Sequence, residues 1–285
     1  MLGSALFAGA VALGTLSDDL DPRSVTAQGI LEADLHVHPF PGDGALPVWE
    51  LQREAARRGL DVIAVTAHNN RFALDVGRAF EGVPDLIVLP GQEITAPRYH
   101  VVAVGTDTLI DWRLTARQAI EAVHAQGGIA IAAHPVETSW RDSDPAALAL
   151  LDGTEVAHPG MRPTPPWRDE YLQFFRRLQQ INPDVAPIGS TDFHTSAPLG
   201  LCRTYLLTDD RSAGGVLDAI RRGRTVARRP NGRLHGADAD VAVVERYLSG
   251  RNPLPGASPT EQAAAYVALA ALALLSWPAD RRNRR

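Results

Sequence analysis

The stretch LEADLHVHPFPGDG, residues 31–44, carries the pattern from which the fold can be predicted. Its apolar run Ala33–Val37 has the composition of a buried strand and leads into a polar pair, His36 and His38. Because side chains two apart on a strand point to the same face, the two imidazoles are expected to lie side by side. Asp43 follows in a glycine-rich loop, PGDG. The stretch therefore predicts a buried strand that carries metal-binding side chains at its end.

Short apolar runs of the same kind recur along the chain and alternate with amphipathic stretches. This alternation is typical of an α/β fold with a buried, mostly parallel sheet. Seven or eight such units favour a barrel over an open sheet. The expected strands are Ala33–Val37, Val62–Thr66, Leu86–Leu89, Val101–Gly105, Ile129–Ala132, Thr154–Ala157, Ala186–Ile188 and Thr204–Leu207. The expected helices are Val48–Arg58, Thr115–Gln126, Pro145–Leu151 and Asp169–Gln180.

Polar side chains that can bind metals stand at the ends of these apolar runs. In a parallel barrel all strand C-termini share one rim, so residues far apart in sequence can converge there. His100 is the exception, because it opens its run and must reach the rim from the preceding loop. The residues that follow the later runs are His68, Glu93, His134, Asp192 and His194.

The composition of this set predicts a cluster of metals. A single histidine near a strand end is usually an ordinary polar residue, but nine similarly placed residues favour a shared site. Imidazole nitrogens and carboxylate oxygens are the ligands that Zn²⁺, Mn²⁺ and Fe²⁺ use in proteins. Nine ligands exceed the needs of one ion, so two or three divalent ions are expected, with a carboxylate bridging two of them.

Other catalytic classes are excluded by what the sequence lacks. All 28 basic residues are arginine, so chemistry that needs a lysine amine, such as a Schiff base or a P-loop lysine, is ruled out. The single cysteine, Cys202, excludes an intramolecular disulfide and a cysteine-rich zinc module. No GxSxG elbow is present. A net charge of −5 gives no reason to expect nucleic acid as the main partner.

With these motifs in hand, the sequence resembles the PHP family, named for polymerase and histidinol phosphatase. The resemblance covers roughly Leu31 to Arg229 and includes the HxH pair, the Asp of GDG, the GxE glutamate, the AHP histidine and the closing DxH. It implies a distorted seven-stranded (β/α) barrel with a trinuclear site of Zn, Mn or Fe at the C-terminal rim of the strands.

The resemblance also implies a distribution of the ligands and a reaction. One metal would be held by His36, His38, Glu93 and Asp192; a second would share Glu93 and add His100 and His134; a third would take Asp43, His68 and His194. The implied reaction is hydrolysis of a small phosphate ester by a metal-bound hydroxide that attacks in line. One departure concerns the usual TDHD motif, which is TAHN here, with Ala67 and Asn69 replacing acids. A partner of His68 is therefore expected to be lost.

Several further residues are weighed for roles beside the metals. His158 follows the strand Thr154–Ala157, where it either donates a proton to the leaving group or is a rim histidine bonded to its own loop. Arg98 and Arg162 lie in loops of the same rim and are candidates for a bidentate phosphate contact. Glu155 and His124 are expected to be structural.

The two ends of the chain are apolar and leave two interpretations open. Residues 1–20 begin with an uncharged Ala- and Leu-rich segment, and residues 262–279 form an uncharged run followed by an arginine cluster. Both segments either span a membrane, which would place the barrel outside the cytoplasm, or form alanine-rich helices on a soluble cytoplasmic protein. Between them we expect the barrel at residues 31–229 and an extension and linker at residues 230–260.

Three functions stay open at this point. The leading one is a phosphoesterase that acts on a small-molecule substrate. The second keeps the metals but hydrolyses a carbamate or an amide-like ester. The third is a non-catalytic metal-binding module of a membrane assembly.

Overall fold

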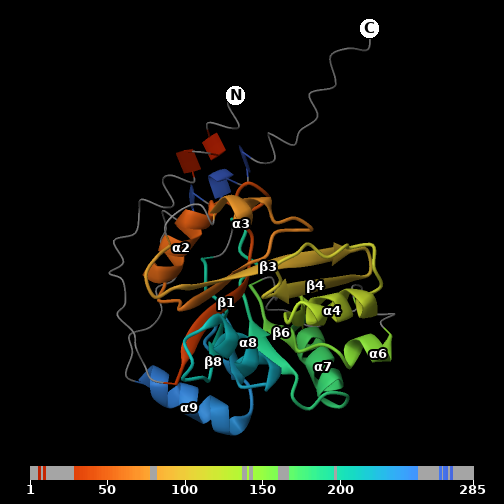
Figure 1. The fold of residues 1–285 in the computed structure, drawn as a ribbon. Helices are drawn as coiled ribbons and strands as arrows, with labels where there is room; N and C mark the ends of the chain where they lie inside the picture. Colours follow the sequence, from red (N-terminus) through yellow and green to blue (C-terminus); the bar gives the residue numbers. More distant parts are fainter. Residues whose placement is uncertain are drawn as a thin grey trace.

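We describe the fold from a computed structural model of the chain, shown in Figure 1. The structure describes residues 6–7, 9–10, 29–77, 82–136, 140, 144–159, 167–195, 198–249, 263–264, 266–268 and 270–271. Its strands are β1 (Leu31–Val37), β2 (Val62–Val65), β3 (Ile87–Ala96), β4 (Tyr99–Val104), β5 (Ile129–Ala132), β6 (Gly153–Ala157), β7 (Ala186–Gly189), β8 (Arg203–Leu206), β9 (Thr225–Arg228) and β10 (Leu234–His235). Its helices are α2 (Val48–Arg57), α3 (Phe72–Gly77), α4 (Ala116–Ala125), α6 (Pro145–Leu148), α7 (Trp167–Gln179), α8 (Ala213–Arg221) and α9 (Asp238–Ser249).

The strands form one mixed sheet that curls into a nearly closed barrel. Its order is β10-β9-β8-β1-β2-β3-β4-β5-β6-β7. The sheet closes on itself where β9, the strand next to β10, lies beside β7. There the Thr225 hydroxyl of β9 donates to the Pro187 carbonyl of β7 at 3.0 Å. The predicted α/β barrel is thus confirmed.

Strand direction differs from the expected, mostly parallel arrangement in ways that matter for the site. β1, β2 and β3 are parallel, and so are β5, β6 and β7, whereas β4 is antiparallel to both of its neighbours and β8 is antiparallel to β1. β3 is also longer than its apolar run, because it continues to Ala96 and turns directly into β4. The start of β4 therefore lies at the same rim as the ends of the parallel strands, which explains how His100 reaches that rim.

Apolar side chains fill the interior of the barrel and also pack helices on its outer surface. Side chains of β1, β2, β5 and β7 pack together with Val216 and Ile220 of α8. Because α8 contacts β3, β5 and β8 and follows the end of antiparallel β8, it closes the barrel end away from the rim. A second layer packs α4, α6 and α7 on the strands around β5, on one side of the molecule in Figure 1. A third packs α2 on β1 and β2.

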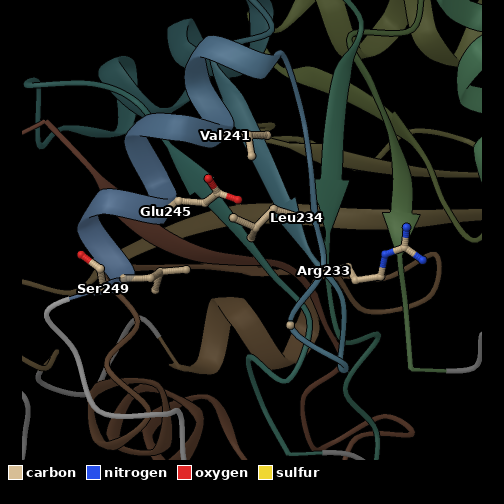
Figure 2. A pocket seen from close by; sticks show the side chains of 7 residues that line it. Arg233, Leu234, Val241, Glu245 and Ser249 are labelled. Atoms are coloured by element: carbon tan, nitrogen blue, oxygen red, sulfur yellow. The ribbon is translucent and has the colours of Figure 1, made fainter.

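Residues 230–249 form β10 and α9, which pack against the barrel far from the rim. The Tyr247 hydroxyl donates to Glu32 at 2.8 Å near the start of β1, and Glu32 also pairs with buried Arg203 at 2.5 Å. Between α9 and β10 lies a surface groove lined by Leu234, Val241 and other side chains (Figure 2). None of its lining residues belongs to the nine predicted ligands, so the groove is separate from the predicted site.

The terminal segments and part of the linker fall largely outside the described residues. Only 6–7 and 9–10 of the N-terminal segment, and 263–264, 266–268 and 270–271 near the other end, are described. Across the described residues, no helix combines the length and the apolar character needed to cross a membrane. Of the expected extension and linker at residues 230–260, residues 250–260 lie outside the described residues.

Candidate metal centre

The structure brings the nine predicted ligands together at one rim of the barrel. His36 lies in β1 and Glu93 in the rim half of β3, where the β3–β4 hairpin carries it. Asp43 lies in the loop after β1, and His100 is the second residue of β4. The others follow the ends of their strands: His38 after β1, His68 after β2, His134 after β5, and Asp192 and His194 after β7. Their ligand atoms fall into three groups, within each of which all atoms lie within 4.8 Å of one another.

The most buried group consists of His36, His38, Glu93 and Asp192. Asp192 Oδ1 lies 3.2 Å from His36 Nε2 and 3.0 Å from His38 Nε2. Glu93 Oε2 lies 3.4 Å from each of the same two nitrogens. Two carboxylate oxygens and two imidazole nitrogens thus converge on one point in the barrel wall.

Glu93 also belongs to the second group, with His100 and His134. Its other oxygen, Oε1, lies 2.8 Å from His100 Nδ1 and 3.2 Å from His134 Nε2. The two oxygens of Glu93 therefore face different groups, which is the arrangement of a carboxylate that bridges two ions.

The third group consists of Asp43, His68 and His194 together with His38. Asp43 Oδ2 lies 3.1 Å from Nε2 of both His68 and His194. This group is the open side of the centre, because the side chains of Asp43 and His68 are 47% and 36% exposed whereas those of His36 and Glu93 in the first group are buried.

Buried atoms without hydrogen bonds indicate that the centre suits divalent cations. Glu93 Oε2 and Asp192 Oδ1 are buried and accept no hydrogen bond from the described residues, although imidazole nitrogens lie close by. His36 Nε2 and His38 Nε2 face each other at 3.0 Å. Buried polar atoms are normally satisfied, so this convergence fits a shared cation better than hydrogen bonds between the side chains.

The charges of the centre shift the pKa values of its members in opposite directions. Burial lowers the pKa of His38 and His68, but the attraction of neighbouring carboxylates outweighs it and raises these values to about 9 and about 10. Burial raises the pKa of Glu93 and Asp192, but the His36 charge and neighbouring imidazoles hold both well below the usual range. The carboxylates are thus anionic, and cations are needed among them, either protons or metals.

Neighbouring groups fix the orientation of the imidazoles on the open side. His194 Nδ1 contacts the carbonyl of Asp192 at 2.9 Å, which leaves Nε2 to face Asp43. His68 Nδ1 lies 2.6 Å from the Thr95 hydroxyl. Asn69 holds Thr95 in place by two hydrogen bonds of 3.0 Å to its backbone N–H and carbonyl. The expected loss of a partner for His68 in TAHN is therefore offset by Thr95.

Glycine is required in the GxE motif because strands approach closely there. A Cβ atom at Gly91 would lie 2.6 Å from the Ala103 carbonyl of β4 and 2.9 Å from the Thr66 side chain. No side chain fits between them, so glycine lets β3 pass close to both neighbours and places Glu93 between the groups.

The three residues predicted to act beside the metals, His158, Arg98 and Arg162, differ in where they lie relative to the centre. His158 directly follows β6, and its Nε2 lies 3.2 Å from Asp192 Oδ2, on the side of that carboxylate away from His36 and His38. Arg98 is exposed in the turn between β3 and β4, two residues before His100. Arg162 lies outside the described residues.

Sequence reasoning missed one buried acid at the centre. Glu155 was expected to be structural, yet its Oε1 lies 2.9 Å from Nδ1 of the predicted ligand His36. The signal that could have found it is its place in β6, three residues before His158 and in register with Ile188 of β7. His124, which was expected to be structural, pairs with Asp152 at 2.8 Å, away from the rim.

Comparisons with known proteins add a likeness of fold. No protein-family profile matches the chain. An uncharacterized protein of Methanocaldococcus jannaschii is 28% identical over 140 residues, which cover 44% of this chain and 81% of the relative. A two-domain protein of Bacteroides vulgatus that contains a predicted PHP-like metal-dependent phosphoesterase matches with a TM-score of 0.55 at 21% identity, over 74% of this chain and 68% of that chain.

A second solved structure, an amidohydrolase of Chromobacterium violaceum, has a TM-score of 0.43 at 18% identity, over 57% of this chain and 87% of that chain. The match to the Bacteroides protein shows that the two chains share a fold.

Proposed function

We propose that this chain is a metal-dependent hydrolase of the PHP family, most specifically a phosphoesterase that acts on a small phosphate ester. The observation that carries the proposal is the convergence of nine ligand side chains in three groups, with Glu93 shared between two of them. The fold shared with a protein that contains a predicted PHP-like phosphoesterase supports it.

The three groups would hold two to three divalent ions, of zinc, manganese or iron. Bound ions would lower the pKa of water and neutralise the oxygens of a phosphoryl group. The chain itself keeps Asp43, Glu93 and Asp192 ionised. It also orients the imidazole nitrogens toward these carboxylates. The substrate would enter from the side of Asp43 and His68, because these are the most exposed members of the set.

His158 would donate the proton to the leaving group. Its Nε2 lies beside Asp192 Oδ2 at 3.2 Å, and its side chain is 12% exposed, so it lies at the edge of the centre. A positioned general acid contributes about 10²–10⁴-fold to a rate. Replacement by glutamine should slow esters with poor leaving groups more than activated ones such as p-nitrophenyl phosphate. Arg98 and Arg162 are the candidates for contacts to the remaining phosphate oxygens.

The test is a substrate screen with the full chain after loading with Zn²⁺, Mn²⁺ or Fe²⁺. The panel includes phosphomonoesters, phosphodiesters, short oligonucleotides, and carbamate and amide-like esters. We expect release of inorganic phosphate or of a phosphomonoester, abolished by a chelator and restored by metal.

Two outcomes would contradict the proposal. Hydrolysis of carbonyl substrates alone would assign the chain to the second chemistry considered for it. A chain that binds two or more ions but hydrolyses nothing in the panel would favour a non-catalytic metal-binding role.

A further inference from the structure

The buried carboxylate of Glu155 touches two different groups of the metal centre without belonging to either. Its Oε1 contacts His36 Nδ1 at 2.9 Å and accepts a hydrogen bond from the Ser190 hydroxyl at 2.5 Å. Its Oε2 accepts the backbone N–H of His134 at 2.6 Å. Glu155 itself is fully buried in β6. Both carboxylate oxygens thus contact donors, and these donors come from three other segments of the chain.

The contact with His36 decides which nitrogen of that imidazole is free to bind a cation. A neutral imidazole carries one N–H, and the tautomer is set by the hydrogen bond that the other nitrogen makes. With Nδ1–H donated to Glu155, His36 Nε2 keeps its lone pair. That atom lies 3.2 Å from Asp192 Oδ1 and 3.4 Å from Glu93 Oε2, where it faces the most buried group.

The contact with His134 supports a backbone conformation that is otherwise unfavourable. His134 has φ of 27°, in the positive range that residues other than glycine seldom adopt. Its N–H donates to Glu155 Oε2. This orientation directs the His134 ring toward Glu93 Oε1, at 3.2 Å, in the second group.

We propose that Glu155 is a positioning residue that aligns one ligand in each of two neighbouring metal groups, His36 in the first and His134 in the second. The proposal rests on the metal centre of the proposed function. One carboxylate thus supports ligands of two groups, so a change at Glu155 should weaken metal binding although no ligand is removed.

The isosteric variant Glu155→Gln tests this role because an amide cannot satisfy both contacts. If the amide oxygen accepts from His36, the amide NH₂ faces the N–H of His134, and two donors then oppose each other without an acceptor. If the amide is flipped, its NH₂ donates to His36 Nδ1 and moves the imidazole proton to Nε2, the atom that should bind. Either orientation disturbs one of the groups at nearly constant volume.

A matched control stands at the other end of the same strand. Asp152 directly precedes β6, accepts the Ala130 backbone N–H at 2.8 Å and pairs with His124 at 2.8 Å. It thus has the same kinds of partner as Glu155, a backbone N–H and an imidazole, away from the rim. Asp152→Asn replaces a carboxylate by an amide on the same strand without touching the centre, and both of its partners contact Oδ2, so one amide oxygen can still face them.

The measurement is the affinity of each full-length protein for Mn²⁺ and Zn²⁺ by chelator competition, together with the melting temperature with metal and with EDTA. We expect Glu155→Gln to lose about 10–100-fold in metal affinity, the range for partners of ligand side chains. The rise in melting temperature on adding metal should shrink in parallel. Asp152→Asn should keep the wild-type affinity even if it melts at a lower temperature.

The role would be overturned if Glu155→Gln bound metal with wild-type affinity, or if both variants lost affinity equally. If Glu155→Gln does not fold, Ser190→Ala, which removes one donor to the carboxylate, should still lower the affinity severalfold, and an unchanged affinity would refute the role. A wild type that binds ions in a Glu155-dependent way but hydrolyses no ester would refute the phosphoesterase and leave this inference standing. A wild type that binds no ions would refute both.

Discussion

Replacement of Asp192 probes the centre most directly, because each of its carboxylate oxygens has a different neighbour. Oδ1 lies 3.2 Å from His36 Nε2 and 3.0 Å from His38 Nε2, among the ligands of the most buried group. Oδ2 lies 3.2 Å from His158 Nε2, the proposed proton donor. Asp192→Ala therefore removes an anionic ligand and the partner of the proposed acid in one change.

The expected loss in kcat/KM is at least about a hundredfold, or about 2.7 kcal/mol of transition-state stabilisation. Partners that merely orient ligands are worth about 10–100-fold, and a ligand itself should cost no less. Because Asp192 has φ of 48°, which alanine tolerates poorly, Asp192→Asn is the companion variant. Asparagine keeps the shape and the backbone tolerance but loses the negative charge, so it should bind less metal while remaining folded.

The assay is kcat/KM on the ester found by the screen, with metal content measured on the same samples. His124→Ala is the control, since His124 pairs with Asp152 away from the rim, and it should stay within severalfold of wild type. The double variant Asp192→Ala with His158→Gln should cost less than the two single losses combined, because the residues act through one contact. An Asp192→Ala enzyme with near-wild-type turnover would show that the reasoning about this rim is wrong.

Four further predictions concern protons released by metal binding, the pH dependence of stability, the metal content and the buried ion pair. Binding of Mn²⁺ at pH 8 should release at least about two protons per chain, because His38 and His68 have pKa values of about 9 and about 10 without metal and must lose their protons to bind. The pKa of His36 is raised too, since the charges of Asp192 and Glu93 outweigh its burial. Calorimetry in two buffers that shows no release would contradict this. For the metal-free chain these raised values add stability that is complete below about pH 6.5 and lost as the pH rises through 9 to 10, so its melting temperature should be lower at pH 10 than at pH 7. EDTA should lower the melting temperature of the metal-loaded chain, and metal analysis that finds one ion or fewer per chain would refute the cluster. Arg203→Met should cost about 3–5 kcal/mol in urea unfolding, because it leaves the buried carboxylate of Glu32 without its cation, and a loss below about 1 kcal/mol would show that the pair is dispensable.

Much of the barrel could be predicted because its strands are short, continuous apolar runs. The strand Ile129–Ala132 has the expected bounds, and most others differ by one to three residues. β3 was missed in part, because residues 91–96 include glycine, glutamine and glutamate and do not form an apolar run. β9 was missed because Thr225–Arg228 lies within an arginine-rich stretch.

The sequence by itself determined which side chains can bind metals, because a ligand set depends on chemical type and on placement at strand ends. It also excluded chemistry based on lysine or a serine elbow. Only the tertiary structure decided that β4 runs antiparallel and so carries His100 to the rim. It alone gave Glu155 its neighbours, since His36 is 119 residues away and Ser190 is 35 residues away. Strand direction and cross-strand contacts arise from pairing between distant segments, and the local pattern of one segment does not contain that pairing.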